Sequence, residues 1–239
     1  MPPRTATRVP FTESEATGWA GADPFFVRDV LSGLGNPGKA IPSRWLYDAR
    51  GSELFREIMA LGAYYPTRVE HEILDGHAAE IVAPLSGEAC TVVDLGAGDG
   101  AKTRRVLASL RGRVSRPTYA PIDISAAALA DVSRRMASSF PWLKVRAIRA
   151  EYVDGVRSLG PRDAGPLLVL FLGSNIGNLE PGEAVRFLRT LRRSLRCGDH
   201  VLVGLDLLKD LRVLRAAYDD EQGVTAAFNL NLLDRINRE

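Results

Sequence analysis

From residue 91 onward, short apolar runs rich in β-branched residues alternate with stretches that carry apolar residues at helical spacing. The five apolar runs are residues 91–96, 118–125, 143–152, 166–174 and 200–208. Helical patterns separate most of them, and the turns between are short. Strands that alternate with helices in this way pair side by side in parallel. The sequence therefore predicts an α/β fold with a doubly wound, mostly parallel sheet of five strands.

The first third of the chain has a different pattern. Residues 1–23 are polar and rich in Pro, Gly and Thr, and we expect a loose segment there. Residues 24–85 carry helical spacing with breaks and predict an N-terminal helical region. Residues 86–239 then form the predicted Rossmann-like domain.

Local signals set the expected helix starts in the N-terminal region. Ser52 is placed to cap a helix over 51–61. Thr67 and Glu70 have the spacing of a capping box for the next helix. Pro66 is expected just before this cap, because a proline cannot continue the preceding helix.

Composition narrows the function classes. The formal net charge is +2, from 31 basic and 29 acidic residues, and the arginine-rich run at 188–196 resembles a solvated helix face. We therefore expect no nucleic-acid partner. Cys90, just before a predicted strand, and Cys197, in a turn, occur without a CxxC pair, which predicts neither a metal site nor a disulfide framework. No apolar run approaches about 18 residues, so we expect no membrane span and a cytoplasmic location.

The run VVDLGAGDGAKT leads from the first strand directly into a helix. Gly96, Gly98 and Gly100 allow a tight turn and a close approach of backbone to ligand, at the strand edge where open parallel sheets bind ligands. Asp123 ends the second strand, where a carboxylate can accept both hydroxyls of a ribose. The GxGxG spacing differs from the GxGxxG of dinucleotide sites and suits a nucleoside without a pyrophosphate. A plain glycine-rich turn remains the alternative.

These features resemble the S-adenosylmethionine site of class I methyltransferases. In that comparison Asp123 would hold the ribose, and Glu151 and Tyr152 lie where such enzymes hold the adenine. Lys102 either contacts the cofactor or is a surface lysine of the first helical turn.

The fourth strand ends in FLGSNIGNLEP, at the edge where substrate would meet cofactor. The Asn/Asp–Pro–Pro–aromatic tetrad of many amine methyltransferases does not occur there. Asn178 could contact a ligand, cap the helix that opens at Pro181, or do both.

Several segments together are similar to one narrower family, the histidine-specific methyltransferases of ergothioneine biosynthesis. They are IPSRWLYDARGSELFREIMALGAYYPTRVEHEIL, DLGAGDGAKT, FLGSNIGNLEP, GLDLLKD, AAYDD and GVTAAFNLNLLDRINRE, and the resemblance covers residues 24–239. It implies trimethylation of the α-amine of L-histidine to the betaine hercynine, with S-adenosyl-L-methionine as cofactor.

By position, the resemblance also implies roles for individual residues. The implied cofactor contacts are Gly96, Gly98, Lys102, Asp123, Glu151 and Tyr152. The implied substrate contacts are Tyr64, Asn178, Tyr218 and, near the amine, Tyr47. No residue is assigned as a catalytic acid or base. Tyr64 and Tyr65 could instead form an aromatic packing pair, which is the interpretation we favour for Tyr65.

The chain ends within an amphipathic helix, NLLDRINRE. Class I methyltransferases normally carry seven strands, and the resembled family adds a C-terminal lid with a glutamate and a serine on the imidazole. We expect the C-terminal strand hairpin and this lid to be missing here, and a partner chain could complete the site. The alternatives are a methyltransferase for another aromatic amino acid or amine, and a non-catalytic module that binds a nucleoside or a partner.

Overall fold

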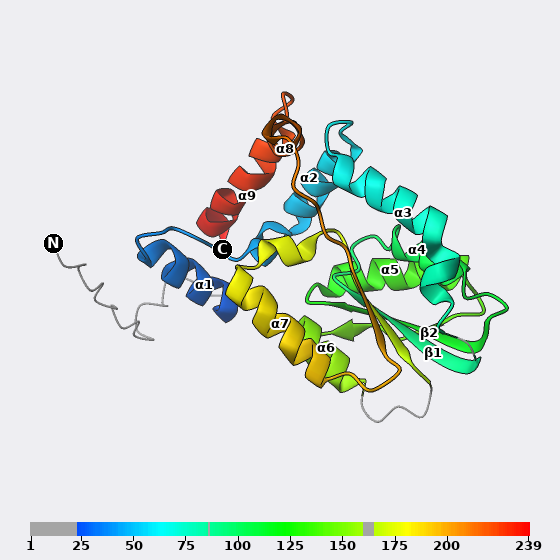
Figure 1. Ribbon diagram of the computed structural model, residues 1–239. Helices are drawn as coiled ribbons and strands as arrows, with labels where there is room; N and C mark the ends of the chain where they lie inside the picture. Colours follow the sequence, from blue (N-terminus) through cyan, green and yellow to red (C-terminus); the bar gives the residue numbers. More distant parts are fainter. Residues whose placement is uncertain (1–22, 86, 160–164) are drawn as a thin grey trace. The chain divides into compact units, whose positions relative to one another are not determined.

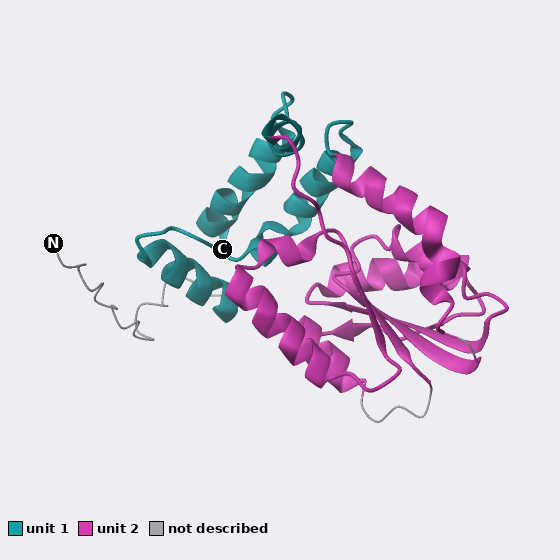
Figure 2. Ribbon diagram, viewed as in Figure 1, with its two compact units in different colours: residues 1–64, 211–239 teal, residues 65–210 magenta. Residues whose placement is uncertain are grey.

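The computed structural model describes residues 23–85, 87–159 and 165–239, so nearly all of the segment expected to be loose lies outside the described residues. The chain divides into two compact units (Figure 2). We call residues 65–210 the sheet unit, and residues 23–64 with 211–239 the helical unit. The domain division at residue 85 stays a prediction.

The sheet unit contains one parallel sheet. Its strands are β1 (Gly87–Leu95), β2 (Val114–Asp123), β3 (Lys144–Val145), β4 (Ile148–Arg149), β5 (Leu167–Phe171) and β6 (His200–Val203). The order is β3-β2-β1-β5-β6, with β4 also paired to β2, and every pairing is parallel. The predicted doubly wound parallel sheet is confirmed. The predicted third strand is two short pieces along β2, which follow each other across Arg146 and Ala147.

Strand β1 begins earlier than the apolar run indicates, so Cys90 lies buried inside the strand and not before it. Successive residues of the central strands face opposite sides of the sheet. Val92 of β1 packs among residues of α3 (Tyr65–Val82), α4 (Thr103–Ala108) and α5 (Ala126–Ser139). Val93 packs on the other face, with residues of α6 (Tyr152–Ser158) and α7 (Pro181–Arg193). Figure 1 shows the two helical layers on the sheet. Because both faces are covered, β5 is buried along its whole length.

The cap of α7 is not the one that the sequence offered as an alternative role for Asn178. The Glu180 side chain caps α7 in a capping box with Glu183, so Asn178 does not cap this helix. Asn178 instead ends a 3₁₀ turn, η3 (Asn175–Asn178). Helix α6, directly after β4, has no counterpart among the expected helices.

Helix α3 begins at Tyr65, two residues before the expected cap. Pro66 therefore lies inside the first turn of α3 and does not precede the helix. A proline is tolerated there because the N–H groups of the first turn have no partner within the helix. The predicted capping box of Thr67 and Glu70 is wrong, since both residues lie within the helix. The Glu70 carboxylate is thus left for other contacts.

The helical unit consists of α1 (Pro24–Gly35), η2 (Ser43–Leu46), α2 (Ala49–Ala60), α8 (Leu211–Tyr218) and α9 (Val224–Arg238). Its small core contains Phe26, Val30 and Trp45, against which residues of α9 pack. Of the described residues, those after β6 form the helices α8 and α9 and no strand. No helix in the described part of the chain is long and apolar enough to cross a membrane.

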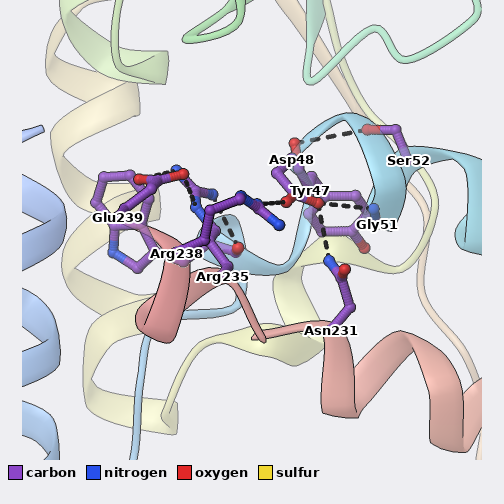
Figure 3. Close-up of polar contacts among 9 residues, drawn as sticks. Tyr47, Asp48, Gly51, Ser52, Asn231, Arg235, Arg238 and Glu239 are labelled. Atoms are coloured by element: carbon purple, nitrogen blue, oxygen red, sulfur yellow. Dashed lines mark hydrogen bonds and ion pairs between the residues drawn. The ribbon is translucent and has the colours of Figure 1, made fainter. Parts of the chain in front are cut away.

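Asp48 links the two ends of the helical unit's sequence (Figure 3). Its carboxylate accepts the Gly51 N–H at 2.7 Å and so caps α2. It also accepts the Asn231 amide at 2.8 Å and pairs with Arg238 at 2.6 Å. The predicted cap by Ser52 is wrong, because the helix starts before Ser52, whose hydroxyl donates to the Tyr47 carbonyl at 3.5 Å.

Candidate active site

The glycine-rich turn follows β1, and each of its three glycines has positive φ. A Cβ on Gly96 would lie 2.8 Å from the Tyr152 hydroxyl oxygen, and a Cβ on Gly100 would lie 2.8 Å from a methyl of Val132 on α5. A Cβ on Gly98 would meet no atom within 4 Å. Two glycines thus permit close packing, whereas Gly98 leaves its backbone open to a ligand.

Asp123 and the start of α6 lie beside this turn. The Gly96 N–H donates to the Ile122 carbonyl at 2.9 Å, and the Ala150 N–H donates to the Asp123 carbonyl at 3.2 Å. The carboxylate of Asp123 accepts the Ser125 N–H at 2.8 Å, and burial raises its pKa. The structure therefore brings Gly96, Asp123, Glu151 and Tyr152 to one edge of the sheet, as expected for neighbouring parallel strands.

The Tyr152 ring is held in place by two phenylalanine rings. It packs against Phe171 of β5 with ring centroids 5.7 Å apart, and against Phe187 of α7 at 6.3 Å. Glu151 is the N-cap residue of α6 and is exposed. An aromatic wall next to an exposed carboxylate suits the flat, polar-edged base of a nucleoside.

Lys102 lies just before α4 and is only partly exposed, with 23% of its side chain accessible. Its ammonium pairs with the Glu70 carboxylate at 2.6 Å. A Cβ on Gly173 would lie 3.1 Å from the Lys102 nitrogen. Lys102 is therefore fixed at the end of β5, in an arrangement unlike that of a solvated surface lysine.

The end of β5 turns sharply through Gly173 and Ser174, which have φ of 76° and 55°. Ser174 is the one non-glycine residue with positive φ in the described chain, and its hydroxyl accepts the Asp206 N–H at 3.0 Å. The Asn175 amide nitrogen lies 3.7 Å from the Cβ position of both Gly96 and Gly173. The Asn175 side chain thus lies between the turn after β1 and the turn after β5, a position that the sequence did not indicate.

The three tyrosines expected at the substrate lie in the helical unit and form one aromatic cluster. The rings of Tyr64 and Tyr218 are 5.6 Å apart, and Tyr47 packs on Phe55 at 5.3 Å and on Phe228 at 5.5 Å. Tyr64 is mostly buried, and Tyr47 and Tyr218 keep exposed surface. Burial, followed by the neighbouring Tyr218, raises the pKa of Tyr47, so its phenol is neutral near pH 7. Asn178 belongs to the sheet unit.

Tyr65, by contrast, contributes to the sheet unit. Its ring is buried, its hydroxyl donates to the Asp206 carboxylate, and the Lys209 ammonium lies 4.7 Å from the ring centre. This packing and hydrogen bonding are enough to explain the residue without a ligand.

The model of a protein family, described as histidine-specific, S-adenosylmethionine-dependent methyltransferases, matches residues 26–239. The chain belongs to this family. The histidine N-alpha-methyltransferases of Mycobacterium tuberculosis and Mycolicibacterium smegmatis are 42% and 41% identical to it over 89% of its length. The ergothioneine biosynthesis protein 1 of Neurospora crassa is 31% identical over 83% of this chain and 23% of its own length. The chain spans 65% of the length of both bacterial relatives.

Membership in the histidine-specific methyltransferase family confirms the resemblance seen in the sequence and, with the strand order, the class I methyltransferase fold. The edge described above fits the family's cofactor in three respects. Gly98 leaves open space, Asp123 offers a carboxylate, and the Tyr152 ring offers an apolar surface. Within the described ranges, no group of three His, Cys, Asp or Glu side chains could hold a metal ion.

Asp94 is a buried carboxyl in β1, just before the glycine-rich turn. Asp94 of β1 accepts the Thr103 hydroxyl at 2.5 Å and the Tyr119 hydroxyl at 2.9 Å, and it is 3% exposed. Burial raises its pKa from 3.8 to about 6, against the hydrogen bonds and the charge of Lys102, which act to lower it.

This carboxyl predicts a pH dependence of stability. Between pH 4 and pH 6 the folded state keeps a proton that the unfolded state has lost, so the contribution of Asp94 to stability falls as the pH rises through this window. We expect the unfolding free energy of the wild type to decrease relative to that of Asp94→Asn by about 2.5 kcal/mol between pH 4 and pH 7. Urea titrations of both proteins measure this difference, and a difference independent of pH would contradict the prediction.

Proposed function

We propose that this protein is an S-adenosylmethionine-dependent Nα-methyltransferase that converts L-histidine to its Nα,Nα,Nα-trimethyl betaine, hercynine, in ergothioneine biosynthesis. The match of residues 26–239 to the histidine-specific methyltransferase family carries this proposal. The names of the bacterial and fungal relatives support the substrate and the pathway.

In this proposal the cofactor lies along the edge formed by the ends of β1, β2 and β4. The backbone at Gly98 passes beside it, the Asp123 carboxylate accepts the ribose hydroxyls, and Glu151 and Tyr152 border the adenine. Lys102 is proposed to contact its amino-acid end. When bound, S-adenosylmethionine supplies an activated methyl group on a sulfonium.

The proposed role of the tyrosines follows from the chemistry of the amine. Methyl transfer requires a neutral nitrogen lone pair in line with the methyl group, and an α-amine is mostly protonated at pH 7. Neutral phenols can orient the nitrogen by hydrogen bonds without adding a competing charge. We propose that Tyr64 borders the reacting nitrogen, with Tyr47 near it, and that Tyr218 and Asn178 hold the carboxylate and amine end.

Mass spectrometry of the reaction products tests the proposed function. The protein is incubated with S-adenosylmethionine and L-histidine, and in parallel with L-tryptophan. We expect histidine to gain one, two and finally three methyl groups, with little methylation of tryptophan. Preferential methylation of tryptophan would instead indicate an enzyme for another aromatic amine, and the absence of any product would contradict a methyltransferase function.

Replacement of Tyr64 by phenylalanine tests the substrate site. The ring contact with Tyr218 is kept, so we expect the fold to be unchanged and the KM for histidine to rise about 3- to 10-fold, as loss of one hydrogen bond implies. Tyr65→Phe is the matched control, because its hydroxyl binds Asp206 and it should leave this KM unchanged. Equal effects of the two replacements on KM would show that Tyr64 has no special role.

A further inference from the structure

Glu70 of α3 is the centre of a polar network at the C-terminal edge of the sheet. One carboxylate oxygen accepts the Gly173 N–H at 2.8 Å, the other accepts it at 3.1 Å, and the carboxylate also pairs with the Lys102 ammonium at 2.6 Å. A single side chain thus joins α3, the residue before α4 and the end of β5. All of these residues belong to the sheet unit.

Two glycines make room for this network. A Cβ on Gly204, at the end of β6, would lie 2.3 Å from a carboxylate oxygen of Glu70, and a Cβ on Gly173 would lie 3.1 Å from the Lys102 nitrogen. The Glu70 and Lys102 side chains are 15% and 23% exposed. An ion pair this far from water is screened less than a surface pair, so its charge matters to a neighbouring ligand.

The charge of Lys102 affects the substrate and product forms of the proposed cofactor differently. The sulfonium of S-adenosylmethionine is itself a cation, and an uncompensated ammonium at the same strand edge would repel it. The product, S-adenosylhomocysteine, has lost both the methyl group and this positive charge. A negative partner on Lys102 therefore favours the substrate form of the cofactor over the product form.

We propose that Glu70 is a positioning residue of the cofactor site, which fixes Lys102 to the end of β5 and cancels the lysine charge so that the sulfonium form of the cofactor can bind. This inference rests on the proposed cofactor binding. Besides holding Lys102 in place, Glu70 would then make the site prefer S-adenosylmethionine to S-adenosylhomocysteine, which differ by one methyl group and one charge.

Binding titrations with S-adenosylmethionine and S-adenosylhomocysteine test this role in Glu70→Gln. The amide can still accept the Gly173 N–H but carries no charge. We expect the ratio of the Kd for S-adenosylmethionine to the Kd for S-adenosylhomocysteine to rise about tenfold, because the negative charge of Glu70 no longer offsets the positive charge of Lys102 near the sulfonium. In Lys102→Met the uncompensated Glu70 carboxylate should shift the ratio of the two Kd values by a similar factor in the opposite direction.

Two further variants separate charge from position. Glu70→Asp keeps the charge but shortens the side chain, so both Kd values should rise while their ratio stays near that of the wild type. Asp75→Asn is the matched control, because Asp75 pairs with Arg105 at 2.5 Å from the same helix, and both Kd values should be unchanged. Thermal unfolding of each variant reports any loss of structure.

The outcomes distinguish this inference from the proposed function. If the wild type binds neither ligand, the proposed cofactor site is wrong and this role of Glu70 is wrong with it. If the wild type binds both and Glu70→Gln weakens both equally, Glu70 is merely structural and the inference is overturned while the proposed function stands. A ratio in Lys102→Met that stays at the wild-type value would overturn it as well, even if Glu70→Gln did not fold.

Discussion

Replacing Asp123 by asparagine is expected to raise the Kd for S-adenosylhomocysteine by about 30- to 100-fold. In the proposed complex the Asp123 carboxylate accepts both ribose hydroxyls, and hydrogen bonds to a charged group contribute about 1.5–3 kcal/mol. An amide at this position can still accept the Ser125 N–H, which the carboxylate accepts at 2.8 Å, so the turn after β2 should keep its shape. The effect should therefore fall on ligand binding and not on folding.

Calorimetric titration with S-adenosylhomocysteine measures the effect of Asp123→Asn. Asp131→Asn on α5 serves as the control, because it makes the same chemical change at a partly exposed carboxylate paired with Arg134 and Arg135. The control should bind like the wild type. An unchanged Kd in Asp123→Asn would place the ribose elsewhere.

The second large effect is expected for Gly96→Ala. Gly96 has a φ of 71°, a region that costs an alanine about 1–2 kcal/mol, and the new Cβ would lie 2.8 Å from the Tyr152 hydroxyl oxygen. Tyr152 is held against Phe171 and Phe187 and cannot move away without disturbing the edge itself. We expect the Kd for S-adenosylhomocysteine to rise more than about 100-fold, which is the loss of roughly 3 kcal/mol of binding free energy.

Gly76→Ala is the matched control for this replacement. Gly76 lies within α3, and a Cβ there would meet no atom within 4 Å. The same chemical change should leave ligand binding intact and stabilise the protein by about 0.5–1 kcal/mol, because alanine favours the helix. Binding by Gly96→Ala as tight as by Gly76→Ala would show that the close contact with Tyr152 does not shape the site.

The sequence was sufficient to predict the parallel sheet, because alternating strands and helices leave few other ways to pair. The run VVDLGAGDGAKT also predicted its turn correctly, since the three glycines need the positive φ that they adopt. The third strand was less predictable. It pairs only along β2 at the edge of the sheet, and its residues form two pieces of two residues each.

Helix starts were the weakest part of the sequence prediction, because several residues near each start could act as caps. Asp48 and Ser52 both have capping side chains. Asp48 is the one that accepts the Gly51 N–H, and it is held there by contacts with α9 that are distant in the sequence. The same ambiguity hid the contacts of Glu70. Its spacing from Thr67 matched a capping box, whereas its actual partners, Lys102 and Gly173, are distant in the sequence.

The central claim is that the sheet unit holds a nucleoside cofactor and that the protein then selects histidine. Calorimetry with S-adenosylhomocysteine, followed by L-histidine and L-tryptophan in separate titrations, tests it most directly. We predict that the protein binds S-adenosylhomocysteine and that the resulting complex binds histidine more tightly than tryptophan. Failure to bind S-adenosylhomocysteine, or binding of it without any binding of histidine, would contradict the claim.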